Sequence, residues 1–279
     1  MQTASLLITI SLAILVLSIG ITPIVQGIPA DNASDTAKEI TGLVVPDTAK
    51  EIAPGVFSLG TTVYQGTLVE GLLIFHHKDG HTRGPGGGGT DDDNGKCFAF
   101  LTDRKVKWKT VEPWIINPSN TEGLAPNEIA SKLSNNIIQW ENSAGKNILG
   151  EGVVTSDTLI ADLSSPDGNN EVYFDNILSP GAIAVAIVWY QVIGPPIIVE
   201  WDMVFDQADF DWTFDPSQAG EADKMDFDNI AAHEIGHVTG MGHPTDDCTE
   251  ETMYRFAGAG ETKKRDLNTG DITGIQRLY

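Results

Sequence analysis

Positive charge is scarce in this chain of 279 residues. Lysine and arginine together number 17, against 39 aspartates and glutamates, which gives a net charge of −22. Binding to phosphate backbones requires a basic face, so the composition argues against nucleic acid as a partner. The same acidity fits solubility in a salty exterior and the binding of calcium.

Charge of either sign is absent from the first 30 residues. The stretch from Leu6 to Val25 is nearly continuous apolar sequence, and it is followed by small residues before Asp31. This order is typical of a secretory signal, although the usual basic residues at its start are missing. A run of about 20 residues can also span a bilayer if it is not cut. We therefore expect export, with residues 1–30 acting as a signal peptide or as an N-terminal membrane anchor.

The chain has only two cysteines, Cys97 and Cys248. In an exported protein, two cysteines most simply form one disulfide. This bond would close a loop of about 150 residues and contribute about 4–5 kcal/mol in the chain-entropy model.

A segment rich in glycine and aspartate, residues 83–96, offers the clearest domain boundary. Its composition is typical of a flexible, charged linker. Before it, Val56–His77 alternates apolar and polar residues around glycines, which predicts two or three strands. We expect residues 31–82 to be a spacer or pro-segment with a few strands, and residues 97–279 to form one compact domain.

The region after the linker mixes the periodicities of helices and strands. Apolar residues recur at helical spacing from Pro126 onward, and two apolar runs rich in isoleucine and valine predict strands. Capping residues predict two later helices. The predicted elements are the helix at Ile129–Trp140, strands at Ile183–Val192 and Ile197–Phe205, and helices at Asn229–Thr239 and Asn268–Leu278. This order predicts an α+β fold, an α/β sandwich.

The strongest chemical signal is the stretch from His233 to His243, which reads HEIGHVTGMGH. On a helix, residues i and i+4 share one face, so His233 and His237 can bind one metal ion. Gly240 can adopt the positive φ that ends a helix and turns the chain. The turn can then bring His243 back as a third ligand.

Three neutral imidazoles would leave zinc its full double charge and one open position for water. Glu234 lies beside the first ligand and can reach that water as a general base. An HExxH sequence can arise by chance in a charged helix, and histidines are often plain surface residues. Here, however, three of the six histidines in the chain fall at the required spacing. The motif therefore predicts one catalytic zinc site.

The pattern HExxHxxGxxH is the signature of the metzincin metalloproteases, and residues 97–279 resemble their matrixin branch. Thr252-Met253-Tyr254 is similar to the Met-turn, in which Met253 would pack beneath the zinc. The ending Asp266–Tyr279 resembles the matrixin terminal helix, and Val204–Asp206 resembles the acidic strand before the active-site helix. The resemblance implies a twisted mixed sheet, an active-site helix, a Met-turn and a C-terminal helix, preceded here by a small β-rich segment.

Two positions depart from the animal matrixins. Val204 and Val185 stand where those enzymes place histidines for a second, structural zinc, so we do not expect a second zinc. The cysteine-switch motif that holds such enzymes latent is also missing. A thiolate from Cys97 that caps the zinc remains an alternative to a disulfide between Cys97 and Cys248.

The resemblance also implies calcium ligands among the acids that surround the strand at Ile197–Phe205. The alternative is that these side chains simply line a solvated strand face. The candidates are Glu200, Asp202, Asp206, Asp209, Asp211 and Asp215. By contrast, no fixed spacing supports a metal role for His76, His77 and His81, which we expect on an exposed turn.

These observations predict a zinc-dependent metalloendopeptidase that acts on a protein or peptide substrate. An extended substrate would pair with Ile183–Val188, which resembles the edge strand of the family. We expect a monomer that meets a membrane only through an uncleaved N-terminal segment. The alternatives are a non-catalytic extracellular zinc-binding surface protein on a metzincin scaffold and a zinc hydrolase that acts on a non-peptide bond.

Overall fold

The computed structural model describes residues 41–79 and 97–279. The predictions for residues 1–30, for the linker 83–96 and for His81 lie outside these residues. Within the described ranges, no helix combines the length and the apolarity needed to cross a bilayer.

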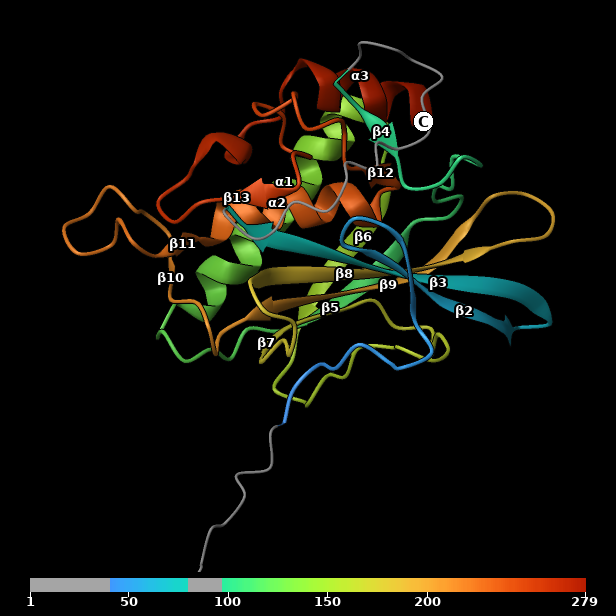
Figure 1. Cartoon of the computed structure of the whole chain (residues 1–279), viewed down its shortest axis with the longest axis horizontal. Coiled ribbons are helices and arrows are strands. Elements are labelled where there is room, and N and C mark those ends of the chain that lie inside the picture. Colours follow the sequence, from blue (N-terminus) through green and yellow to red (C-terminus); the bar gives the residue numbers. More distant parts are fainter. Residues whose placement is uncertain (1–40, 80–96) are drawn as a thin grey trace, which may run out of the picture. The chain divides into compact units, whose positions relative to one another are not determined.

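A mixed sheet of nine strands forms the framework (Figure 1). Its order is β1-β2-β3-β8-β9-β7-β5-β6, and β13 pairs with β3 at the end of that strand. Strands β9, β7, β5 and β6 run parallel to one another, whereas β8 is antiparallel to both β9 and β3. The strands are β1 (Lys50–Ala53), β2 (Val56–Tyr64), β3 (Thr67–Lys78), β5 (Glu112–Asn117), β6 (Leu149–Val154), β7 (Glu171–Asp175), β8 (Ala182–Gln191), β9 (Ile198–Asp206) and β13 (Phe256–Ala257).

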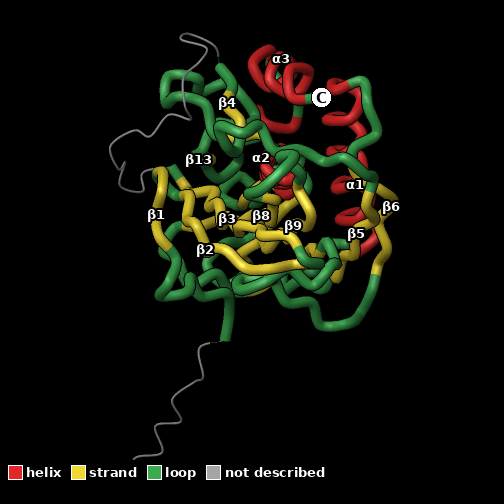
Figure 2. Tube along the Cα trace, turned by 90° about the vertical axis from the view of Figure 1, so that its right-hand side faces the viewer, coloured by secondary structure: helices red, strands yellow, loops and turns green. Residues whose placement is uncertain are grey.

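Three α-helices lie together on one side of this sheet, as the two perpendicular views show (Figures 1 and 2). They are α1 (Pro126–Ala144), α2 (Phe227–Val238) and α3 (Thr269–Leu278), and the 3₁₀ helix η1 (Lys263–Arg265) precedes α3. Two short strand pairs complete the fold: β4 (Ala99–Phe100) with β12 (Met241–Gly242), and β10 (Trp212–Thr213) with β11 (Met225–Asp226). The α+β architecture predicted from the sequence is confirmed.

The predicted apolar stripe of α1 is the face that packs into the core. Ile129, Leu133, Ile137 and Trp140 are all buried. The indole N–H of Trp140 donates a hydrogen bond of 2.8 Å to the carbonyl of Ala232 in α2. This bond satisfies a buried donor and fixes α1 against α2.

A second apolar cluster fills the opposite face of the sheet, where loops cover it. Val185 on β8 and Val204 on β9 lie directly opposite each other in the strand register, and both are fully buried. These are the two positions compared with the histidines of a structural zinc site. Here they contribute packing, because aliphatic side chains cannot bind a metal.

The N-terminal strands are not separate from the region after the linker. Strand β3 pairs with β8 from Val69, opposite Gln191, to His77, opposite Ala182. The predicted boundary at residues 83–96 therefore does not divide the sheet. The expectation that Ile183–Val188 is an edge strand is wrong, because β8 has a neighbour on each side. Composition could identify the linker, but it could not show which strands pair across it.

Cys97 and Cys248 form a disulfide with a Cα–Cα distance of 5.4 Å. The alternative of a Cys97 thiolate on zinc is therefore wrong in this structure. The bond joins the segment before β4 to the loop between β12 and the Met-turn residues.

Candidate metal centre

A capping side chain sets the start of helix α2, and a glycine follows its end. The side chain of Asp226 accepts a hydrogen bond of 2.7 Å from the backbone N–H of Asn229, which caps the first turn. The guanidinium of Arg265 pairs with the same carboxylate. The helix ends at Val238, and Gly240 follows with a φ of 105°, a conformation that favours glycine.

The turn after α2 brings the three predicted ligands together. The Nε2 atoms of His233 and His237 lie 3.1 Å apart. The Nε2 atom of His243 lies 3.2 Å from that of His233 and 3.0 Å from that of His237. Three imidazole nitrogens thus face a single point.

Backbone carbonyls orient the histidine rings on the helix. The Nδ1 atom of His233 lies 2.6 Å from the carbonyl of Thr252, and that of His237 lies 3.0 Å from the carbonyl of Met241. A carbonyl can only accept, so Nδ1 carries the proton in both rings and Nε2 presents its lone pair. Burial lowers the pKa of His233 and His243, and it lowers the pKa of His237 to about 4. Neutral imidazole is the form that binds a metal.

The nitrogen triangle fits a zinc ion. Zinc–nitrogen bonds of about 2.0–2.1 Å in a tetrahedron place the ligand atoms about 3.3 Å apart. The three observed distances, 3.0–3.2 Å, are close to this value. His233, His237 and His243 can therefore hold one zinc ion and leave its fourth position to another group.

Met253, the residue compared with the Met-turn methionine, packs against the helix that carries His233 and His237. Its side chain is fully buried, and a Cβ built on Gly236 would overlap its sulfur. The carboxylate of Asp271 on α3 accepts hydrogen bonds from the backbone N–H groups of Thr252, at 2.7 Å, and Met253, at 3.1 Å. Asp271 also completes the capping box with Asn268 at the start of α3.

Glu234 is completely buried beside the ligands. Burial raises the pKa of its carboxyl group, while the charge of Lys264 lowers it. One carboxylate oxygen, Oε1, lies 3.1 Å from the Nδ1 atom of His76. The other oxygen, Oε2, has no hydrogen-bond partner. A buried carboxylate with a free oxygen can accept a proton from a reacting group.

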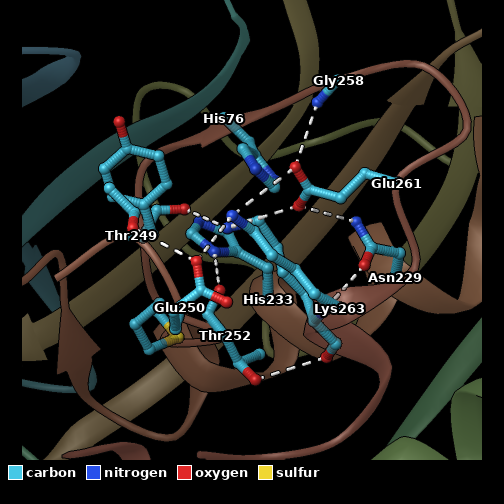
Figure 3. Close-up of polar contacts among 12 residues, drawn as sticks. His76, Asn229, His233, Thr249, Glu250, Thr252, Gly258, Glu261 and Lys263 are labelled. Carbon is cyan, nitrogen blue, oxygen red and sulfur yellow. Dashed lines mark hydrogen bonds and ion pairs between the residues drawn. The ribbon is translucent and has the colours of Figure 1, made fainter.

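His76 was expected on an exposed turn, and this expectation is wrong. Its side chain is fully buried, and its ring stacks on that of His233 with centroids 3.8 Å apart (Figure 3). The alternation of side chains along the strand could have indicated that His76 is buried. Leu72, Ile74 and His76 alternate along β3, and the first two pack in the core beneath the helices. The alternation alone could not show that this face of β3 contacts the metal centre, because that contact depends on the pairing of β3 with β8.

The six acids proposed for calcium do not form one cluster among the described residues. Asp202 and Asp206 instead accept hydrogen bonds from backbone N–H groups of neighbouring loops and of strand β7. Glu200 lies with Asp162 and Asp167 in a group whose carboxylate oxygens are within 4.8 Å of one another. One oxygen of Glu200, Oε1, is buried without a hydrogen-bond partner.

Parts of this chain are similar in sequence to known proteins. Residues 185–279 match the family model of matrixin, peptidase M10. Metalloendoproteinase 2-MMP of Arabidopsis thaliana is 31% identical over 160 residues, which cover 54% of this chain and 37% of that protein. Matrilysin of Homo sapiens is 41% identical over 78 residues, which cover 28% of this chain and 26% of that protein.

The chain thus spans less than half of the length of these curated relatives. Among solved structures, metalloproteinase-II from Bacteroides fragilis is similar with a TM-score of 0.35 and 11% identity. That likeness covers 82% of this chain and 77% of the other.

Proposed function

Because the chain carries a matrixin-like metzincin catalytic domain, we propose that it is a zinc-dependent endopeptidase that uses Glu234 as its general base. The observation that carries this proposal is the convergence of three Nε2 atoms within 3.2 Å of one another, next to a buried carboxylate. A site with three protein ligands keeps a position for water or substrate, whereas a structural zinc site is closed by four.

Zinc bound by the three histidines would polarise a scissile carbonyl and lower the pKa of water at its open position. The chain supplies the remaining functions. Thr252 and Met241 hold the rings of His233 and His237 so that their lone pairs face the ion. Glu234 accepts the proton of the attacking water and passes it to the leaving amine. A raised carboxyl pKa makes Glu234 a stronger base for the first transfer, and the more basic leaving amine draws the proton from it in the second.

Two other functions compete with this proposal. A non-catalytic zinc-binding surface protein would have no use for a buried glutamate beside an open metal position. A zinc hydrolase acting on a non-peptide bond would keep the same groups but would leave polypeptides intact. Activity on an unfolded protein separates the three.

The test measures cleavage of reduced, alkylated casein and of a mixed peptide library by the zinc-loaded chain. The chain is assayed as purified and after brief trypsin treatment that is then quenched with a trypsin inhibitor. We expect cleavage that a zinc chelator abolishes and that Glu234→Ala lacks although it retains one zinc per chain. A Glu234→Ala variant that cleaves at the parental rate would exclude Glu234 as the base. Silence from every zinc-loaded form would favour the non-catalytic alternative.

We further propose that Glu200, with Asp162 and Asp167, binds calcium. Three carboxyl groups offer the hard oxygen ligands that this ion prefers, and the oxygen of Glu200 without a hydrogen-bond partner is available to an ion that replaces its proton. Added calcium should raise the melting temperature of the parent and leave that of Glu200→Gln unchanged. An equal response of both proteins would place the calcium site elsewhere.

The uncharged N-terminal 30 residues and the disulfide support export, so we propose that the protein acts outside the cell on protein or peptide substrates. Mass spectrometry of protein recovered from the medium would show whether residues 1–30 are removed. Recovery of all protein from the cytoplasm with reduced cysteines would contradict export.

A further inference from the structure

Strand β3 covers the candidate active site, so the chain's own backbone lies where a substrate would bind. An extended peptide that reaches a metal at the edge of a sheet binds by adding a strand to that edge. Strand β8, the neighbour of β9 on that side, already has such a strand. Residues Val69–His77 of β3 pair antiparallel with it.

The C-terminal end of β3 is held from a second side. Strand β13, which follows the Met-turn, pairs in parallel with β3, with Phe256 opposite His77 and Ala257 opposite Lys78. The N–H of Asp79 also donates to the carbonyl of Ala257 at 2.9 Å. The end of β3 thus lies between β8 and the segment after Met253. An extended peptide in this position could form backbone hydrogen bonds with both segments.

His76 is the residue of this strand that contacts Glu234 and His233. Its Nδ1 atom contacts Glu234 at 3.1 Å, and its ring covers that of His233. A ring nitrogen of His76, a carboxylate oxygen of Glu234 and a ring nitrogen of His233 lie within 4.8 Å of one another, a spacing that suits a shared metal ion. The other ring nitrogen of His76, Nε2, is buried without a hydrogen-bond partner, which is costly unless a ligand is bound.

The strands before β3 complete the cover. A cavity of about 110 Å³ reaches His237 and His243, and Ile52, Pro54 and Val56 contribute to its wall. His233, Glu234 and His237 are fully buried with this segment in place. While β1–β3 remain where they are, their backbone takes up the side of β8 to which an extended substrate would pair.

We propose that β3 is an internal inhibitor, in which residues 69–79 occupy the place of an extended substrate and His76 covers Glu234 and the open side of the metal. This inference rests on the proposed endopeptidase function. The inhibitor is part of the same chain, so its effective concentration at the site is high and substrate competes only when the strand is displaced. Activity is therefore set by the fraction of molecules in which β3 has left β8.

The test uses the full chain, with His76→Ala as the variant and Thr67→Ala, on the same strand but outside residues 69–79, as the control. Cleavage of the peptide library by His76→Ala should exceed that of the parent by about tenfold or more, because the masked site becomes populated. Thr67→Ala should cleave like the parent. Parental cleavage equal to or faster than that of His76→Ala would overturn the inference and leave the endopeptidase function standing.

Two further measurements do not depend on cleavage. In the cobalt-substituted protein, His76→Ala should change the visible absorption spectrum, because the surroundings of the metal change. Acetohydroxamate, a small chelating probe, should bind the cobalt form of His76→Ala about tenfold more tightly than the parent. If no form cleaves, these data still decide whether His76 covers the metal, and only the endopeptidase function fails.

A parent-only experiment guards against a variant that does not fold. We expect weak acetohydroxamate binding by the unmodified cobalt protein, which strengthens at urea concentrations below the main unfolding transition as β3 opens. Tight binding by the unmodified protein without urea would show an open site and overturn the inference.

Discussion

The carboxylate of Asp271 accepts a hydrogen bond of 3.1 Å from the backbone N–H of Met253, although the two residues belong to different parts of the fold. The same carboxylate caps the start of α3 and holds the N–H of Thr252 at 2.7 Å. Because the carbonyl of Thr252 orients His233, the last helix of the chain is connected to the metal centre through two residues.

Replacing Asp271 with asparagine should therefore loosen both the fold and the metal site. An asparagine has one acceptor oxygen for three backbone donors, and bonds to a charged group are worth about 1.5–3 kcal/mol. We expect the free energy of unfolding to fall by about 2 kcal/mol and zinc affinity to weaken. Urea denaturation and competition with a zinc-binding dye measure these effects. Asp266→Asn, at an exposed position of the same region, is the control, and equal stability of the two variants would contradict the prediction.

Gly236→Ala should destabilise the protein although alanine favours helices. In an isolated helix the change would stabilise by about 1 kcal/mol. In this fold the new methyl group would overlap the sulfur of Met253 and approach the ring of Trp140. We expect a loss of about 1–3 kcal/mol from overpacking. Gly258→Ala, whose Cβ would have its nearest neighbour at 3.7 Å, should leave the melting temperature almost unchanged. A gain in stability from Gly236→Ala would show that Met253 does not pack against the helix.

Removal of the disulfide should lower stability without removing the metal ligands. Cys97 and Cys248 are separated by 151 residues, a loop length for which the chain-entropy model gives about 5 kcal/mol. The double variant Cys97→Ser/Cys248→Ser should unfold at lower denaturant concentration and still bind one zinc per chain when folded. Denaturation curves and metal analysis check this prediction, and an unchanged midpoint would count against it.

In calcium-free buffer, Glu200 should make stability depend on pH. Burial raises its pKa from 4.5 to about 9, so the folded protein keeps a proton that the unfolded chain loses. A raised pKa in the folded state contributes stability below pH 4.5, and this contribution is lost as pH rises towards 9. Glu200→Gln should flatten this decline in melting temperature between pH 5 and 9. The exposed Glu151→Gln should retain it, and parallel curves for parent and Glu200→Gln would refute the assignment.

The local features of the metal centre could be predicted because short-range rules govern them. The spacing of His233 and His237 fixes their common helix face, and Gly240 permits the turn that returns His243. Capping residues predicted the two later helices, and Asp226 and Asn268 cap them in the structure. The acidic residues illustrate the opposite case. Their spacing along the chain did not show that Asp202 and Asp206 would bind loop backbones, because those loops approach only in the folded protein.

The sequence by itself determined the α+β class, the helix ends and the grouping of three histidines next to a glutamate, because each depends on residues close together in the chain. Only the tertiary structure decided that β3 lies beside β8 and that His76 meets Glu234 across 158 positions. Strand pairing uses backbone groups that every residue carries, so sequence patterns define strands but seldom their neighbours. The closure of this site follows from that pairing.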